Sequence, residues 1–388
     1  MADKEILFIK MGSFSQINNN VQKFLEREFK EHTISVFNVK PTDLSFIQLL
    51  VNVYYFTIEY GLDIIRGKRN AKDLLLWFLG TSYVSQQLSR RIIKRNKGKN
   101  YLFTIQTQSL FNGKLENIPH FVYTDHTTQT NLLYPDIDPK QFMKSTRFIK
   151  KAETKIYQDA SMIFTFGSKI TWSLLNHYKI PEEKVVTVFA GSNVETKNLD
   201  NAAKYYRKNI LFVGVEWERK GGPVLLKIFE KVCAVHADAS LTIVGCSPKV
   251  SLPNCQVIGK IPVEKVADYY NNASVFCMPT LREPFGIVFI EAMSYKLPII
   301  ANDIGSLPDI VENGYNGYLV NNNVEEYAAA ILKLFANPAD CRQMGENGYA
   351  LTRSKFSWEL VGKNIKNRIE PFLREEPKFR VSKTEVKS

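Results

Sequence analysis

The chain has 388 residues, a length that exceeds one core of ordinary size and therefore predicts two domains. Hydrophobic residues make up 45% of it and charged residues 23%, which is the composition of a globular protein. The five cysteines lie in the second half and include no Cys-x-x-Cys pair, which excludes a disulfide framework and a zinc site and favours a reducing compartment.

The first residues lead directly into a short strand, without the charged and then apolar pattern of a signal sequence. No stretch of about 20 residues is free of polar groups, so we expect no membrane-spanning helix and a cytoplasmic location. The net charge of +12 favours nucleic acid, anionic lipid or phosphorylated substrates as partners. Nucleic acid is the weakest of these, because the chain has no basic–aromatic alternation and no recognition motif.

The first part of the chain alternates strands and helices, which predicts βαβ units and a parallel sheet. A strand at Ile6–Ile9 leads through Gly12 into a helix at Asn20–Phe29, and a strand rich in β-branched residues follows at Thr33–Val39. Gly12 is a single glycine and does not complete a G-x-G-x-x-G fingerprint.

Two long apolar segments follow, at Leu44–Arg66, which Asp43 could cap, and at Ala71–Lys94. One interpretation is that both are helices that pack on the sheet. The other is an aromatic and basic ridge that lies at a membrane interface or receives an acceptor with a lipid tail. Cations are concentrated after this region in two clusters, which are either solvated faces or contact surfaces. They are Arg90, Arg91, Lys94, Arg95, Lys97 and Lys99, and then Lys140, Lys144, Arg147, Lys150, Lys151 and Lys155.

Polar residues follow two predicted strands at the ends where parallel sheets place ligands. The strand Tyr101–Ile105 is followed by Gln106, and the strand Phe121–Thr124 is followed by Asp125 and His126. A lone histidine is often structural, but this position favours a functional role for His126.

The motif Asp136-Ile137-Asp138 resembles a metal ligand set of a different fold, but it stands between two prolines with no strand before it, so we interpret it as a turn. The following elements continue the alternation of helix and strand. They are predicted at Arg147–Ala160, Met162–Phe166, Thr171–Tyr178 and Val185–Phe189. Residues 193–208 are polar and have no apolar period, which predicts a linker between domains.

The second half repeats the alternating pattern. Its predicted strands are Asn209–Val213, Leu241–Val244, Val257–Ile258 and Val275–Met278, and its predicted helices are the segment around Val224–Val232, Val263–Asn271, Val324–Phe335, Cys341–Thr352 and a last helix ending at Leu373. Gly214 follows the first of these strands, and Arg219 and Lys220 stand at the start of the next helix. The helix dipole disfavours cations there, so the pair indicates a bound anion.

The stretch from Leu281 to Val320 has the strongest functional pattern. Glu283 and Glu291 stand eight residues apart around Pro-Phe-Gly-Ile-Val-Phe-Ile, and Ile287–Tyr295 is predicted to be a short apolar helix that contains Glu291. Gly286 allows the backbone to approach a ligand, and the first turn of this helix would present free N–H groups to a phosphate. A buried strand at Leu297–Ala301 follows and ends before Gly305.

This stretch, with its Gly-x-x-Pro-Asp turn, and the Phe-Val-Gly and Arg-Lys-Gly strings that begin at Phe212 and Arg219 resemble the family-4 retaining glycosyltransferases. The resemblance implies the α/β GT-B fold, in which two Rossmann-like, doubly wound domains face each other across a cleft. It implies an acceptor-binding domain at 1–192, a linker at 193–208, a nucleotide-sugar domain at 209–355 and a return helix with a charged tail at 356–388.

The resemblance also implies roles for individual residues. Arg219 and Lys220 would hold the donor diphosphate, and Glu283 would hold hydroxyls of the donor sugar. Glu291 would accept hydrogen bonds from the ribose, and His126 would lie on the acceptor side of the anomeric carbon. The other donor-binding positions are Gly12, Gly214, Phe285, Gly286, Ile287 and Val288. Ser306 stands where many relatives carry a second glycine.

The resemblance implies a retaining, metal-independent glycosyltransferase that uses a UDP- or GDP-sugar and no other cofactor. The expected acceptor is a lipid, a lipid-linked glycan or another glycan, met at the inner face of an anionic membrane. The alternatives are a nucleotide-sugar epimerase or hydrolase of the same fold, a transferase with a soluble small-molecule acceptor, and a non-catalytic scaffold that binds nucleotide sugar.

Overall fold

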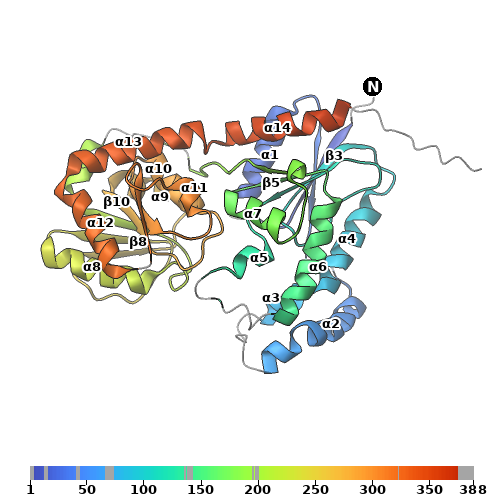
Figure 1. The fold of residues 1–388 in the computed structure, drawn as a ribbon, viewed down its shortest axis with the longest axis horizontal. Helices are drawn as coiled ribbons and strands as arrows, with labels where there is room; N and C mark the ends of the chain where they lie inside the picture. The colour runs from blue at the N-terminus through green and yellow to red at the C-terminus, as the bar shows by residue number, and fades with distance from the viewer. Residues whose placement is uncertain are drawn as a thin grey trace, which may run out of the picture.

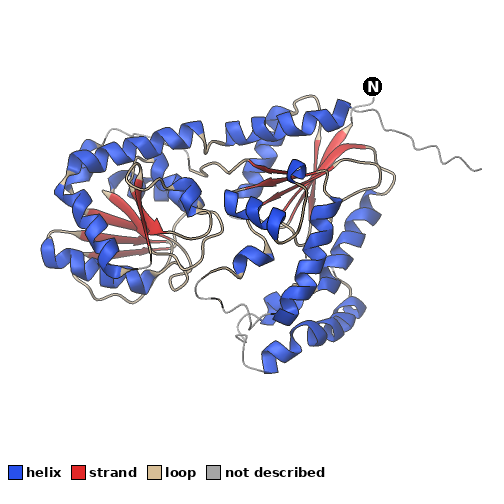
Figure 2. Ribbon diagram, in the orientation of Figure 1, coloured by secondary structure: helices blue, strands red, loops and turns tan. Residues whose placement is uncertain are grey.

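The computed structural model describes residues 4–12, 16–40, 44–65, 74–134, 137, 143–194, 196, 201–321 and 323–374. Two α/β domains lie side by side, each built on one six-stranded sheet (Figure 1). Every strand pairing in both sheets is parallel. Helices cover the sheets in each domain (Figure 2). The two parallel sheets expected from the alternating pattern are confirmed.

The first sheet has the strand order β2-β1-β3-β4-β5-β6. Its strands are β1 (Glu5–Lys10), β2 (Ile34–Asn38), β3 (Tyr101–Thr107), β4 (His120–Thr124), β5 (Met162–Thr165) and β6 (Val185–Thr187). The central strands β1, β3, β4 and β5 are buried almost throughout, as expected for parallel strands covered on both faces. Phe8, Phe103 and Phe121 are among the fully buried aromatic residues of this core.

The helices of the first domain differ from the sequence prediction in that a short helix at Thr128–Asn131 was not predicted and one predicted segment is divided. They are α1 (Ile17–Glu28), α2 (Phe46–Ile65), α3 (Leu74–Leu79), α4 (Ser82–Asn96), α5 (Thr128–Asn131), α6 (Met143–Asp159) and α7 (Ser168–Asn176), with a 3-10 turn η4 (Glu182–Lys184). The predicted single segment Ala71–Lys94 is wrong, because the chain breaks between α3 and α4. Thr81 accepts a hydrogen bond from the Val84 amide at 3.2 Å and so caps α4.

The second sheet has the order β12-β11-β10-β7-β8-β9. Its strands are β7 (Asn209–Val213), β8 (Ser240–Val244), β9 (Cys255–Gly259), β10 (Val275–Met278), β11 (Ile299–Asn302) and β12 (Gly317–Val320). The strand β12 was not predicted, because it holds only four residues and no β-branched run. Around the sheet lie η5 (Ala202–Tyr206), α8 (Gly222–Val235), α9 (Val263–Asn272), α10 (Ile287–Ser294), α11 (Leu307–Ile310), α12 (Val324–Ala336) and α13 (Pro338–Ser354).

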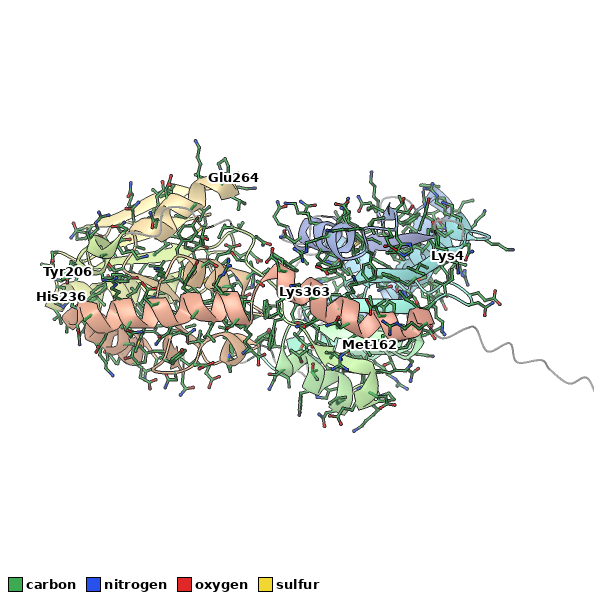
Figure 3. The ribbon with its side chains drawn as sticks, turned by 90° about the horizontal axis from the view of Figure 1, so that it is seen from above. Lys4, Met162, Tyr206, His236, Glu264 and Lys363 are labelled. Carbon is green, nitrogen blue, oxygen red and sulfur yellow. The ribbon has the colours of Figure 1, made fainter. Side chains whose placement is uncertain are left out.

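The last helix, α14 (Trp358–Arg374), joins the two domains. Figure 3 shows Lys363 on this helix between the lobe that carries Lys4 and Met162 and the lobe that carries His236 and Glu264. Trp358 stacks on Phe24 of α1 with ring centroids 6.4 Å apart. Arg27 of α1 also donates a hydrogen bond to the Trp358 carbonyl at 3.1 Å. These contacts hold the end of the second domain on the first.

Some sequence predictions fall on positions that lie outside the described residues. These are the cap at Asp43, the carboxylates Asp136 and Asp138, and the charged tail from residue 375. Within the described part of the chain, no helix is long and apolar enough to cross a membrane.

Candidate active site

The loop between β10 and α10 brings Glu283 and the start of α10 to the same place. Gly286 precedes α10 with a φ of 102°. A Cβ atom at this position would lie 2.8 Å from the Phe289 ring and 2.9 Å from the Leu307 side chain, so both the conformation and the space require glycine. Phe289 and Met293 anchor α10 in the core. The N-terminal amides of α10 are therefore held at a fixed site beside Glu283.

Lys220 and Glu283 form an ion pair at this site. Lys220 precedes α8, and its Nζ atom contacts Glu283 Oε2. Both residues are buried, with 9% and 6% of their surfaces exposed. A buried carboxylate or ammonium group is costly without its partner, so each side chain offsets the cost of burying the other and fixes its orientation.

Arg219 lies on the more exposed side of the same loop. Its Nε atom donates to Glu216 Oε2 at 2.7 Å, and its Nη1 atom donates to the Arg282 carbonyl at 2.7 Å. The Arg219 carbonyl accepts a hydrogen bond from the Leu281 amide at 2.9 Å. These bonds connect the loop after β7 to the loop after β10, so Arg219 and Lys220 stand next to the Glu283 segment.

Glu291 is buried on α10, apart from the Lys220–Glu283 pair. Its carboxylate accepts a hydrogen bond from the Tyr270 hydroxyl at 3.0 Å, and the side chain and backbone of Asn193 also bond to it. Burial raises the pKa of Glu291 to about 7, although the hydrogen bonds from Tyr270 and Asn193 act in the opposite direction. Asn20 of α1 donates to Asn193 Oδ1 at 2.7 Å, so this network reaches the first domain.

His126 follows β4 in the first domain and is paired with the residue before it. Its Nδ1 atom lies 2.6 Å from Asp125 Oδ1. Burial lowers the pKa of His126, but the charge and hydrogen bond of Asp125 outweigh burial and raise this pKa to about 9. The Thr124 hydroxyl donates to the His126 carbonyl at 2.9 Å and fixes the turn after the strand. Asp125 therefore favours the protonated form of His126.

The two predicted glycines occupy different environments. Gly12 is exposed, and its amide donates to Asn38 Oδ1 at 3.3 Å, within the first domain. Gly214 is buried at the end of β7, where its amide donates to the Val244 carbonyl at 2.9 Å. A Cβ atom at Gly214 would lie 3.2 Å from Lys220 Cγ. Gly214 thus lies beside Lys220, whereas the hydrogen bond of the Gly12 amide fixes its loop to the end of β2.

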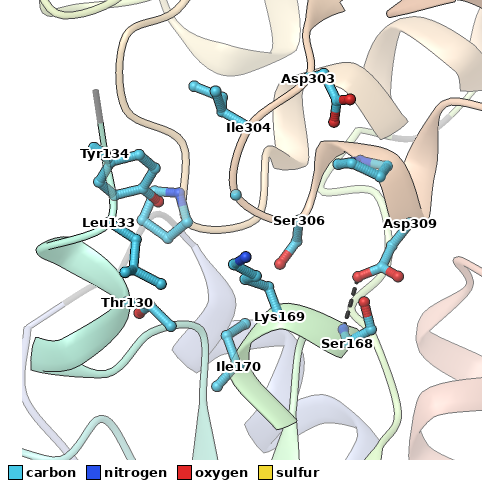
Figure 4. Close-up of a pocket in the computed structure, with 13 residues that line it drawn as sticks. Thr130, Leu133, Tyr134, Ser168, Lys169, Ile170, Asp303, Ile304, Ser306 and Asp309 are labelled. Carbon is cyan, nitrogen blue, oxygen red and sulfur yellow. Dashed lines mark hydrogen bonds between the residues drawn. The ribbon is translucent and has the colours of Figure 1, made fainter. Parts of the chain in front are cut away.

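The domains touch each other next to Glu283. The Tyr134 hydroxyl bonds to the Glu283 backbone, and the buried ring of Phe285 packs against Phe166 at 5.5 Å between centroids. Asp309 accepts a hydrogen bond from the Ser168 amide at 2.7 Å, which caps α7 from the other domain. A cavity of about 370 Å³ lies between these contacts. Figure 4 shows Lys169, Ser306 and Asp309 among the residues that line it.

Gly305 packs directly on the Glu283 segment. It has a φ of 57°, and a Cβ atom there would lie 1.9 Å from the Glu283 carbonyl oxygen. The neighbouring Ser306 is buried, and its hydroxyl has no hydrogen-bond partner among the described residues. The glycine of the Gly-x-x-Pro-Asp turn therefore sets the close approach of the loop after β11 to Glu283.

The sequence did not indicate several residues that contact the predicted site. Tyr270 and Asn193 bond to Glu291, Asn20 bonds to Asn193, and Tyr134 contacts Glu283 from the other domain. They are far apart in the sequence and belong to no motif, so only the folded chain brings them together. In the described residues, no group of three or more histidine, cysteine or acidic side chains could hold a metal ion.

Comparisons with known proteins agree with this architecture. Residues 203–351 match the family model of the Glycosyl transferases group 1. An uncharacterised glycosyltransferase of Methanocaldococcus jannaschii is 28% identical over 262 residues, which are 65% of this chain and 68% of the relative.

Two solved structures have the same fold over nearly the whole chain. One is WaaG, a glycosyltransferase involved in lipopolysaccharide biosynthesis, with a TM-score of 0.65 at 12% identity over 92% of this chain and 98% of its own. The other is HepE of Anabaena, solved in complex with UDP and glucose, with a TM-score of 0.61 at 12% identity over 95% of this chain and 99% of its own. Together these matches support the glycosyltransferase class. The chain therefore has the GT-B fold, and the match over residues 203–351 supports a relationship to the glycosyl transferases group 1.

Proposed function

We propose that the chain transfers a sugar from a nucleotide-sugar donor to a glycan or lipid-linked acceptor, with retention of anomeric configuration and without a divalent metal. The observation that carries this proposal is the buried Lys220–Glu283 pair beside the N-terminus of α10. One site then offers a cation, a carboxylate and free backbone amides, which match a diphosphate next to a sugar.

The leaving diphosphate gains negative charge as the bond to the sugar breaks, and groups already in position stabilise that charge best. Lys220 has three N–H donors, so it can bind a phosphate oxygen while it keeps Glu283. Arg219 supplies a planar fork for a second phosphate oxygen in place of Glu216. The amides of Ile287 and Val288 lie at the positive end of α10. These groups replace the charge that a metal ion would supply.

The sugar lies between Glu283 and His126 in this proposal. Glu283 accepts hydrogen bonds from the sugar hydroxyls, and the His126 imidazolium donates one from the acceptor side. A protonated imidazole cannot accept the proton of the acceptor hydroxyl, so its raised pKa argues against a histidine base. The bond from C1 to the diphosphate oxygen breaks, the bond from C1 to the acceptor oxygen forms on the same face, and the acceptor proton passes to the departing diphosphate.

The nucleotide and the acceptor are proposed from the neighbours and from charge. HepE was solved with UDP and glucose, which favours a uridine nucleotide, with Glu291 on the ribose hydroxyls. WaaG acts in lipopolysaccharide biosynthesis, which favours an acceptor carried on a lipid. The net charge of +12 is consistent with work at an anionic membrane surface.

We expect turnover to continue when divalent metals are removed. The protein should be incubated with a panel of UDP- and GDP-sugars in excess chelator, and release of the nucleoside diphosphate should be measured. Because water can replace the sugar acceptor slowly, this release measures donor cleavage even though the acceptor is not yet identified. If chelator abolishes release and magnesium or manganese restores it, the metal-independent mechanism is wrong.

A further inference from the structure

The helix α2 exposes its apolar side and buries its polar side, which is the reverse of an ordinary surface helix. Asn52, Glu59 and Asp63 are buried, with 0%, 2% and 5% of their surfaces exposed. Nine of the large apolar residues of α2 are exposed, whereas Tyr60 is buried. The exposed members are Phe46 73%, Ile47 72%, Leu50 55%, Val51 39%, Val53 50%, Tyr54 65%, Ile58 36%, Leu62 43% and Ile65 82%.

Hydrogen bonds from the buried side hold α2 in this orientation. Asn52 donates to the Phe78 carbonyl at 2.6 Å and accepts from the Thr81 hydroxyl. Glu59 accepts from the Ser82 amide at 3.0 Å, and the Tyr60 hydroxyl donates to the Gly80 carbonyl at 3.1 Å. Rotation of α2 to bury its apolar side would break these bonds and leave buried polar groups unpaired. The exposed face is therefore built into the fold.

The short helix α3 extends the same surface. Leu74 and Leu75 at its start are exposed, Leu75 to 70%. Phe78, farther along α3, contacts Phe56 of α2 with ring centroids 5.6 Å apart, so α3 lies against α2. Figure 1 shows both helices at the edge of the first domain farthest from α14. We call the exposed apolar residues of α2 together with Leu74 and Leu75 the α2–α3 face.

A basic groove begins next to this face. It lies between α4 and α6, starts at Ser82 and Ser85 beside the α3–α4 turn, and is lined by Arg90, Lys114, Lys151 and Lys155. Glu116 and Asp159 also line it, and Asp159 is paired with Lys155 at 3.4 Å. The cations outnumber the acids, so the groove attracts an anionic surface. The other cations of α4 are Arg91, Lys94 and Arg95, and the last two lie in the final turn of the helix, away from α3 (Figure 1).

We infer that the α2–α3 face docks on an anionic lipid bilayer, with α2 lying in the headgroup boundary and the basic groove next to the lipid phosphates. A helix of 20 residues with one continuous apolar side suits this position. Exposed aromatic residues such as Phe46 and Tyr54 are well suited to a membrane interface. The inference deepens the proposed function, on which it rests for the claim that the acceptor is a lipid.

Charge favours a bilayer over a second copy of this chain as the occupant. Two copies that met through this face would bring two basic grooves together in a protein of net charge +12, and like charges across an interface are unfavourable. An anionic bilayer satisfies both the apolar face and the cations. Binding should therefore depend on anionic lipid and weaken as salt screens the cations.

The test is co-sedimentation of the full chain with vesicles of phosphatidylcholine alone and of phosphatidylcholine mixed equally with phosphatidylglycerol. We expect binding to the mixed vesicles at low salt. The double variant Leu50→Glu, Tyr54→Glu should lower the partition coefficient at least about tenfold, because two apolar contacts with lipid are replaced by charges. The matched control is Tyr206→Glu, Val235→Glu, which changes two exposed residues of the second domain and should alter binding by no more than about twofold.

Two results would overturn the inference. One is wild-type protein that stays in the supernatant with the mixed vesicles at low salt. The other is a dimer, seen by light scattering, that the Leu50→Glu, Tyr54→Glu variant converts to a monomer while vesicle binding is unchanged. UDP affinity, measured by calorimetry, should be the same in every variant. Vesicle binding without donor turnover would support the docking surface and contradict the proposed function. Failure of the docking inference can therefore be distinguished from failure of the proposed function.

Discussion

Replacing Lys220 by alanine is expected to lower kcat/KM for donor cleavage by roughly 10²–10³-fold, the effect of removing one preorganised group that stabilises a developing negative charge. The expected loss has two sources. The diphosphate loses its buried cation, and the buried Glu283 carboxylate loses its partner. Release of nucleoside diphosphate from the best donor of the panel measures the effect.

The matched control is Lys231→Ala, because Lys231 lies on the neighbouring helix α8 and is paired with the exposed Glu325 at 2.8 Å. This variant should keep nearly full activity. The double variant Lys220→Ala, Glu283→Gln removes both charges and should restore folding stability lost in the single variant, but not activity. Full activity in a folded Lys220→Ala protein would show that the diphosphate is bound elsewhere.

Replacing Glu291 by alanine is expected to weaken binding of the nucleoside diphosphate by about 1–3 kcal/mol, the usual cost of losing a charged hydrogen-bond acceptor. The binding should also depend on pH. Because burial raises the pKa of Glu291 to about 7, this carboxyl is protonated in the free protein below that pH. The ribose hydroxyls bond better to a carboxylate, so affinity should rise as pH increases through about 7.

Titration of Glu291 also changes the stability of the fold, and this effect runs in the opposite direction from its effect on nucleotide affinity. Its pKa rises from 4.5 to about 7 on folding, so the folded state binds more protons between these values. Stability should therefore fall as pH rises through this range and level off above it. The variant Glu291→Gln should remove both dependences. Calorimetric titration of the wild-type protein and of Glu291→Gln with UDP measures the pH dependence of affinity. Titration of the UDP phosphate contributes equally to both proteins, so the difference between their profiles reports Glu291. Equal pH profiles would contradict the role assigned to Glu291.

The sequence predicted the fold because its signals were local and repeated. Buried strand residues, such as Phe8 in β1 and Ile210 in β7, belong to short apolar runs that alternate with amphipathic helices. Gly286 and Gly305 were informative for the same reason, since the residue type itself reports an unusual backbone or a close approach. The pattern around Glu283 and Glu291 was therefore visible before the chain was folded.

The contacts between domains could not be predicted in this way. The bonds from Asn20 to Asn193, from Asn193 to Glu291, and from Ser168 to Asp309 join residues that no periodicity relates. The orientation of α2 was also hidden, because its apolar content suits a buried helix as well as an exposed one. The hydrogen bonds of Asn52, Glu59 and Tyr60 to residues of α3 and the α3–α4 turn hold the apolar side of α2 outward.

The most direct test of the proposed mechanism is the anomeric configuration of the sugar that the wild-type protein releases from its donor. Time-resolved proton NMR can record donor hydrolysis in excess chelator and observe the free sugar before its anomers interconvert. The mechanism predicts release of the nucleoside diphosphate and first appearance of the sugar in the configuration that it had in the donor. Appearance of the opposite anomer, or no cleavage of any nucleotide sugar in the panel, would contradict the proposal.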